Sequence, residues 1–204
     1  DFEQTKTAID GSDIVYFTVG LPMDSSLWEA NFLIIMENVI AACKLYGSKL
    51  VFFDNTYMYP KDSEPQTETT PFIPIGRKSI VRAKMAEMVL SEIHNHELDA
   101  VICRAPEFYG PDKTQSITNT MFLDKIKEDK TASIPINSSC QRSLIWTPDA
   151  SRAMVLIANT PSAYNQTWHL PCDKPYSYNE LKQIAEKVLN KKVSYGDTHD
   201  QSEV

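Results

Sequence analysis

The sequence has little glycine, and the glycines it has do not form a phosphate-binding pattern. Only 6 Gly occur among 204 residues, they are scattered, and no Gly-x-x-Gly-x-x-Gly is present. Such a loop places backbone N–H groups at a helix N-terminus close to the phosphates of a ligand. The sequence given therefore carries no pyrophosphate loop of this kind. A Gly-x-Ser-x-Gly segment is also absent, which argues against a hydrolase with a serine nucleophile elbow.

Basic charge, long apolar runs and paired cysteines are missing as well. The net charge is -7 and the pI is about 5.1, which argues against nucleic-acid and anionic-membrane partners. No apolar run approaches the ~20 residues of a membrane helix, and no signal-peptide pattern occurs. The 4 cysteines show no CxxC spacing, and three of them lie in apolar surroundings. We therefore expect reduced thiols in a cytoplasmic protein without a metal site.

Short apolar runs alternate with helical patterns along the chain. With 204 residues and 42% hydrophobic content, the chain can bury one ordinary core. This order predicts an α/β fold in which a parallel sheet is flanked by helices. The strands are expected at residues 13–20, 50–53, 99–104 and 166–171, and the helices at residues 2–9, 28–46, 77–90, 115–130, 150–157 and 178–189.

The stretch from Lys49 to Leu90 is where a site is expected. The strand Leu50–Phe53 ends abruptly in Asp54-Asn55-Thr56. Polar residues after a buried parallel strand lie at its carboxyl end, where open α/β sheets bind ligands. On the following helix, Lys78 and Arg82 share a face at i, i+4 spacing, which favours an anionic ligand. Another face of this helix is formed by Ile80, Val81, the stem of Lys84, Met88 and Leu90.

This stretch resembles the active-site half of an extended short-chain dehydrogenase/reductase. The likeness is to the atypical branch of NAD-dependent epimerase/dehydratase-like proteins, and Glu68-Thr-Thr-Pro71-Phe-Ile-Pro74 fits the family's Glu-x-x-Pro-x-x-Pro loop. The family has a Ser or Thr after the strand and Tyr-x-x-x-Lys on the helix. Here Asn55, Lys78 and Arg82 stand at these positions. The resemblance implies a Rossmann-like fold and catalytic roles for these three residues, with Arg82 in the ribose-binding role.

Two further segments carry the resemblance. Arg104-Ala-Pro-Glu-Phe-Tyr-Gly-Pro111 is similar to the family's Arg-x-x-x-(Val/Phe)-Tyr-Gly-Pro motif, which implies that Pro106 and Glu107 lie near the nicotinamide. Thr18, Val19 and Gly20 end the first strand, and the resemblance implies that they pass along the cofactor. The implied cofactor is NAD or NADP in the full-length parent, and the resemblance is compatible with a homodimer. The residues implied to contact a small-molecule substrate are Tyr57, Phe108, Arg142 and His169.

The resemblance covers only the middle of the family. Its first strands and Gly-rich loop are expected before Asp1, and the rest of its substrate lobe after Val204, so we interpret the chain as part of a longer protein. Residues 1–106 are expected to belong to the dinucleotide-binding domain, 107–196 to the substrate lobe with returning core elements, and 197–204 to a polar tail.

Two functions remain open. One is an NAD(P)-dependent enzyme acting on a nucleotide-sugar-like or other hydroxyl or carbonyl substrate. The other is an NAD(P)-binding sensor or scaffold without redox turnover. The changed catalytic positions favour the second, and the motifs of the substrate lobe favour the first.

Overall fold

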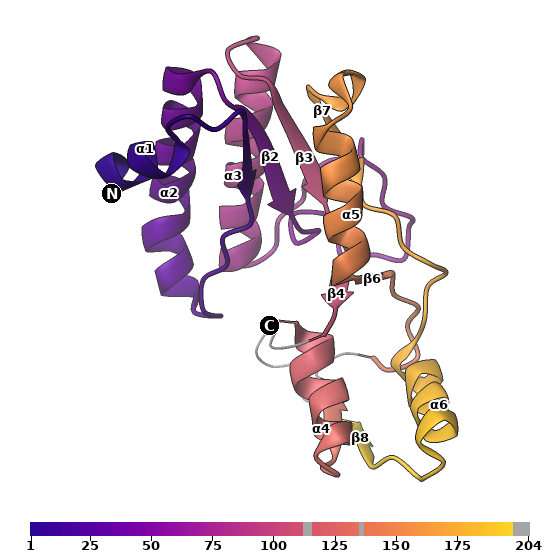
Figure 1. Cartoon of the computed structure of the whole chain (residues 1–204). Coiled ribbons are helices and arrows are strands. Elements are labelled where there is room, and N and C mark those ends of the chain that lie inside the picture. The colour runs from indigo at the N-terminus through magenta and orange to yellow at the C-terminus, as the bar shows by residue number, and fades with distance from the viewer. Residues whose placement is uncertain (112–115, 135–136, 198–204) are drawn as a thin grey trace. The chain divides into compact units, whose positions relative to one another are not determined.

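The computed structural model describes residues 1–111, 116–134 and 137–197 (Figure 1). The chain forms two compact units. Unit 1 consists of Asp1–Ala105 and Arg152–Leu170, and unit 2 consists of Pro106–Ser151 and Pro171–Val204. The chain thus leaves unit 1 after Ala105, builds most of its second unit, and returns to unit 1 with residues 152–170.

Unit 1 is built on a parallel sheet of four strands in the order β1-β2-β3-β7. Strands β2 and β3 are apolar runs buried along most of their length, as central strands of a parallel sheet are. The predicted Rossmann-like α/β fold is confirmed. The strands are β1 (Ile14–Phe17), β2 (Lys49–Asp54), β3 (Ala100–Arg104) and β7 (Gln166–His169).

Three helices precede or connect the first strands of this sheet: α1 (Phe2–Ile9), α2 (Ser25–Tyr46) and α3 (Arg77–His94). Helices α2 and α3 lie side by side (Figure 1). α2 begins after Asp24, whose carboxylate accepts the Ser26 N–H at 2.7 Å, and ends at Gly47, where the backbone φ is 70°. The shared core includes Phe17, Phe32, Met36, Leu50, Phe52, Met85, Val89 and Ile102.

α2 is the one helix in the described ranges that is long and apolar enough to cross a membrane by length and composition. Its side chains Trp28, Phe32, Met36 and Cys43 are buried in the core of unit 1. The apolar content of α2 therefore has a structural reason within the fold, because a core helix must cover the sheet with apolar side chains.

The cysteines divide into two kinds. Cys43 and Cys103 are buried, and burial raises the pKa of their thiols to about 11 and about 12. Cys140 and Cys172 are exposed. Two cysteines, rather than the expected three, are therefore core residues.

α3 buries a different face from the one that its apolar residues outline. Val81 is buried, but Ile80 is 42% exposed, whereas Arg82 is only 5% exposed. A charged side chain takes a core position because its partner, Asp54, lies at the end of β2. The buried residues of α3 are Ser79, Val81, Arg82, Ala83, Met85, Ala86 and Val89.

The described residues of unit 2 form two short parallel strand pairs, a π-helical segment and three helices, one of them shared with unit 1. Strand β4 (Glu107–Tyr109) pairs with β6 (Leu144–Trp146), and β5 (Ala132–Ile134) pairs with β8 (Tyr195–Asp197). The π-helical segment Thr118–Leu123 continues into α4 (Asp124–Lys127), and α6 is Tyr178–Leu189. Helix α5 (Thr147–Ala158) starts in unit 2 and ends in unit 1, before the 3-10 turn Pro161–Ala163.

Two sequence expectations for unit 2 differ from the structure. The helix expected over residues 115–130 is a π-helical segment followed by the short α4, and residue 115 lies outside the described residues. The tail expected at 197–204 begins with Asp197, which is the last residue of β8, while 198–204 lie outside the described residues. The bounds of α6 are as predicted, since Ser177 and Glu180 form a capping box at its start.

Candidate functional site

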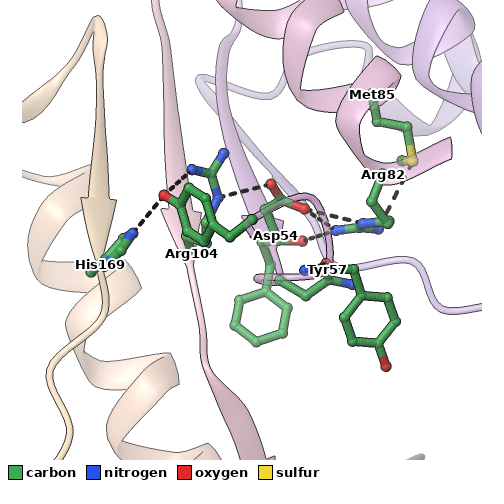
Figure 2. A network of polar contacts seen from close by, with 9 residues as sticks. Asp54, Tyr57, Arg82, Met85, Arg104 and His169 are labelled. Atoms are coloured by element: carbon green, nitrogen blue, oxygen red, sulfur yellow. Dashed lines mark hydrogen bonds and ion pairs between the residues drawn. The ribbon is translucent and has the colours of Figure 1, made fainter. Parts of the chain in front are cut away.

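Three polar residues end neighbouring strands at the carboxyl edge of the unit 1 sheet. Asp54 ends β2, Arg104 ends β3 and His169 ends β7, and strand pairing places them in one row. Figure 2 shows Asp54 between Arg82 of α3 and Arg104, with His169 beyond Arg104. Since α/β folds bind ligands at the carboxyl ends of their strands, this row is the candidate site of unit 1.

Asp54 is a buried carboxylate held by two guanidinium groups. Its Oδ1 accepts hydrogen bonds from Arg82 Nη2 at 2.6 Å and Nε at 3.1 Å, and its Oδ2 accepts one from Arg104 Nε at 3.2 Å. Asp54, Arg82 and Arg104 are 1%, 5% and 1% exposed. Buried charges are tolerated when they are paired and hydrogen-bonded. Because two cations share one carboxylate, the group keeps a net positive charge.

The guanidinium group of Arg82 has contacts besides the one with Asp54. Its Nη2 also donates to the Phe53 carbonyl at 3.2 Å, and the group lies 5.1 Å from the ring centroid of Phe52 and 5.7 Å from that of Phe32. Cation–π contacts of this kind add to the ion pair when they are desolvated. The residue predicted to bind a ribose thus lies inside the core of unit 1, at the end of β2.

Arg104 connects Asp54 to Tyr59 and His169. Its Nη1 donates to the Tyr59 hydroxyl at 2.5 Å, and this hydroxyl lies 2.7 Å from His169 Nε2. Donation from the Tyr59 hydroxyl to a neutral Nε2 satisfies both groups, since the Tyr59 proton is buried and needs an acceptor. Burial lowers the pKa of His169. The negative charge of Glu68 raises this pKa, and the positive charge of Arg104 lowers it. His169 is therefore neutral at neutral pH.

Lys78 lies one turn before Arg82, but its amine has other partners. Lys78 Nζ donates to the Met23 carbonyl at 3.0 Å and lies 5.6 Å from the ring centroid of Trp28. Met23 follows β1, so Lys78 contacts the loop after β1 whereas Arg82 contacts the end of β2. The structure does not bring the two cations to one partner.

Asn55 and Tyr57 lie in the loop that follows β2. Asn55 Oδ1 accepts the Tyr57 backbone N–H at 3.0 Å, a local bond that stabilises the turn. The Tyr57 ring is stacked on Trp28, with centroids 6.3 Å apart and planes 9° apart, and it is 36% exposed. The Tyr57 carbonyl accepts the Ser79 hydroxyl at 2.6 Å. A catalytic role for Asn55 and a substrate contact for Tyr57 stay predictions.

Thr18, Val19 and Gly20 follow β1 and are all exposed, with Val19 at 44%. An exposed strand end of small residues allows a ligand to approach the backbone. A cofactor contact of Thr18, Val19 and Gly20 stays a prediction. The sequence given has no glycine-rich loop that would fit the pyrophosphate.

Glu107 is the centre of a second polar group, in unit 2. Its Oε2 accepts Arg142 Nε at 2.8 Å, and its Oε1 accepts the hydroxyls of Thr118 and Tyr178. Burial raises the pKa of Tyr178, and the charge of Glu107 acts in the same direction, so the phenol stays a donor. The predicted cofactor residue Glu107 and the predicted substrate residue Arg142 are thus partners of each other.

The residues around Glu107 in the chain are half-buried. Pro106 and Phe108 flank it, and the Phe108 carbonyl accepts the Ser116 hydroxyl. Gly110 is held by the Asn119 side chain, which accepts the Gly110 N–H at 3.0 Å and donates to its carbonyl at 2.8 Å. The predicted contacts of Pro106 with a cofactor and of Phe108 with a substrate remain predictions.

Four residues of the unit 1 site were not predicted as site residues: Asp54, Tyr59, Glu68 and Arg104. A signal for two of them is present in the sequence, because Asp54 and Arg104 each end an apolar strand. A charge at the end of a buried strand needs a partner. The register of β2 against β3, which places Asp54 beside Arg104, is not apparent from the sequence.

Comparison with known proteins extends over most of the chain. The model of the NAD dependent epimerase/dehydratase family matches residues 16–170. A curated relative, the uncharacterized protein y4nL of Sinorhizobium fredii, is 30% identical over 138 residues. These residues are 64% of this chain and 36% of the relative, so the chain spans little more than a third of the relative's length.

Solved structures share the fold. UDP-glucuronic acid 4-epimerase from Bacillus cereus, in complex with UDP-glucuronic acid and NAD, has a TM-score of 0.84 at 17% identity. The match covers 97% of this chain and 66% of that chain. UDP-N-acetylglucosamine 4-epimerase from Methanobrevibacter ruminantium, in complex with UDP-N-acetylmuramic acid, has a TM-score of 0.82 at 20% identity and covers 96% of this chain and 67% of that chain.

Proposed function

The chain belongs to the NAD dependent epimerase/dehydratase family, and from this premise we propose that the whole protein binds NAD or NADP without using Lys78 and Arg82 for proton transfer. The observation that carries the proposal is the 2.6 Å contact between Arg82 Nη2 and Asp54 Oδ1, in which both partners are buried. The protein would then act as a cofactor-binding sensor or scaffold.

The energetics of Arg82 support this proposal. To reach a ribose, the guanidinium would have to leave Asp54 and the rings of Phe32 and Phe52. Breaking a buried ion pair by removing one partner costs about 3–5 kcal/mol, because the other charge stays buried without compensation. A cofactor contact would have to supply that free energy. Arg82 is better suited to fixing α3 at the end of β2.

The position of Lys78 supports the proposal as well. A proton-transfer group must come within hydrogen-bond distance of the reacting hydroxyl. The Lys78 amine is bonded to the Met23 carbonyl and lies over Trp28, in a different direction from Arg82. Lys78 therefore serves the loop after β1, where the exposed Thr18, Val19 and Gly20 would lie along the cofactor. A bound nicotinamide would supply hydride chemistry there.

A second candidate function is an NAD(P)-dependent epimerase, dehydratase or reductase that acts on a nucleotide-sugar-like substrate. The observation that favours it is Arg142 in unit 2. Glu107 holds only its Nε, while the side chain is 39% exposed. A guanidinium presented in this way can bind a phosphate through its remaining N–H groups. Phe108, in the same unit as Arg142, would then contribute to substrate binding.

We also propose that the whole protein pairs with a second copy of itself through α2 and α3. Five large apolar side chains are exposed on these helices: Leu27 at 42%, Ile34 at 57%, Leu45 at 60%, Tyr46 at 39% and Ile80 at 42%. A groove between the helices carries both signs of charge, as a self-complementary surface requires. It is lined by Glu37, Ile40, Ala41, Lys44, Met88, Ser91 and Glu92. Light scattering of the wild type and of Ile34→Arg tests this, since a monomeric wild type would contradict it.

The experiment that tests the proposed function compares cofactor binding with turnover. Calorimetry measures the affinity of the whole protein for NAD and NADP. Chromatography of the UDP-sugars measures turnover of UDP-glucuronic acid, because an epimerase or dehydratase returns the hydride to the sugar and leaves no net change in the nicotinamide. We expect binding without turnover, and equal cofactor affinity in Lys78→Met and in the control Lys84→Met, an exposed lysine on the same helix. Fast turnover that Lys78→Met alone abolishes, at unchanged cofactor affinity, would favour the second candidate.

A further inference from the structure

The loop between β2 and α3, residues 55–76, is attached to the end of β7 through His169. Two of its residues bind His169 directly: the Tyr59 hydroxyl lies 2.7 Å from Nε2, and Glu68 Oε1 accepts the backbone N–H at 2.9 Å. Phe72 of the same loop packs edge-to-face on Tyr59, with centroids 5.9 Å apart. Tyr59 itself is 1% exposed. Two residues of the loop therefore bond to a single residue of β7.

A hydrogen bond donated by the Tyr59 hydroxyl to His169 Nε2 requires a neutral imidazole. The Tyr59 oxygen accepts from Arg104 Nη1 at 2.5 Å, and donation to His169 Nε2 gives the buried Tyr59 proton an acceptor. Protonation of His169 would place a proton on Nε2, and two donors would then face each other. The Tyr59 hydroxyl is buried and would lose the acceptor of its proton. Leaving a buried donor unsatisfied is unfavourable, so the pair separates rather than stays in place.

We propose that Tyr59, Glu68 and His169 form a pH-sensitive clasp, which is closed when His169 is neutral and opens when His169 is protonated. The clasp determines how firmly residues 55–76 are held at the carboxyl edge of the unit 1 sheet. It does not depend on the proposed function, because all of its contacts lie within the fold of unit 1.

The charges around His169 come from every element that packs near it. Arg104 of β3 lies next to Tyr59, and Asp54 of β2 is shared between Arg104 and Arg82 of α3. The buried group of Asp54, Arg82 and Arg104 has one positive charge in excess, so it disfavours the imidazolium form of His169. Glu68 of the loop is the group that attracts an imidazolium. Its carboxylate is already used by the His169 backbone N–H, which lowers the pKa of Glu68.

The direction of the pH effect follows from these contacts. Burial lowers the pKa of His169 in the closed state, so the open state binds a proton more readily. Attachment of the loop is complete above the ordinary histidine pKa of about 6.5 and is lost as the pH falls from there to the lowered value. Between these two pKa values, each unit by which the pH falls shifts the equilibrium about tenfold toward the open state.

The experiment combines NMR titration of the histidine side chains with amide hydrogen exchange of the whole protein between pH 5 and pH 8. We expect His169 to titrate below about 6.5. Exchange rates corrected for the intrinsic effect of pH should show the protection of residues 55–76 falling through the same range. The effect should disappear in His169→Gln and persist in the control His94→Gln, an exposed histidine at the end of α3. Loop protection that is independent of pH in the wild type, or equally dependent on pH in His169→Gln, would overturn the proposal.

Two milder variants keep the test decisive if His169→Gln does not fold. Tyr59→Phe removes the hydroxyl, so the pKa of His169 should rise toward its ordinary value and the loop should lose protection at pH 8. Glu68→Gln keeps an acceptor for the His169 N–H but removes the negative charge, so the pKa of His169 should fall further. An unchanged His169 pKa in Tyr59→Phe, or a raised one in Glu68→Gln, would contradict the clasp.

Discussion

Asp54 and Arg82 form a buried ion pair between residues 28 positions apart in sequence, with Arg82 Nη2 2.6 Å from Asp54 Oδ1. The pair joins the last residue of β2 to the first turns of α3 and buries a charge in the core of unit 1. It connects to His169 through Arg104 and Tyr59. The carboxyl edge of the unit 1 sheet is therefore organised by a continuous set of hydrogen bonds.

Replacing Asp54 tests the stability that this set provides. Asp54→Asn keeps the shape of the side chain but leaves two buried guanidinium groups without an anion. The free energy of unfolding should fall by about 3–5 kcal/mol, measured by urea denaturation. The control Asp62→Asn changes an exposed carboxylate in the loop and should alter it by less than about 0.5 kcal/mol. An equal loss of unfolding free energy in the two variants would contradict a stabilising role for the buried charges.

Gly110 tests the close approach of the residue after β4 to Thr147, the first residue of α5. A Cβ at this position would lie 1.9 Å from Thr147 Oγ1. Gly110→Ala should therefore destabilise the protein by about 1–3 kcal/mol through overpacking. Gly196→Ala is the matched control, because a Cβ there would meet its nearest neighbour at an ordinary 3.6 Å. The double variant Gly110→Ala/Thr147→Ala should recover part of the loss in a thermal denaturation experiment, and no recovery would contradict the packing.

Tyr178 links α6 to Glu107 and predicts an alkaline effect. Its pKa is raised by burial, so the unfolded chain releases the phenolic proton first. The stability that depends on the neutral phenol is present below the ordinary pKa of about 10 and is lost as the pH rises above it. Tyr178→Phe should lower stability by about 1 kcal/mol at pH 7 and flatten the loss above pH 10. The exposed control Tyr16→Phe should keep the wild-type profile, and a matching profile for Tyr178→Phe would disprove the argument.

The fold was predictable because its signals are local. Alternating strands and helices are set by short apolar runs and periodic patterns, and α6 begins at a capping box that its own sequence contains. The carboxyl end of β2 was correctly identified as a polar position within the sheet. These features depend on neighbouring residues in the chain, so one sequence is enough to find them.

The site was less predictable because its contacts are distant in sequence. The i, i+4 spacing of Lys78 and Arg82 gave them a common face, but Arg82 turns toward Asp54 and Lys78 toward Met23. Likewise, Glu107 and Arg142 were assigned to different ligands, whereas the packing of β4 on β6 makes them an ion pair. Strand register and helix rotation decide such partners, and neither is encoded in spacing alone.

The most direct test of the structural role of Arg82 is a double-mutant cycle with Asp54, combined with NAD affinity. The variants are Arg82→Met, Asp54→Asn and both together in the whole protein, with unfolding measured in urea and NAD binding by calorimetry. We predict a coupling free energy of at least about 1 kcal/mol and an NAD affinity of folded Arg82→Met within about threefold of the wild type. A coupling near zero, together with a tenfold or greater loss of NAD affinity in Arg82→Met, would contradict this account and assign Arg82 to the cofactor.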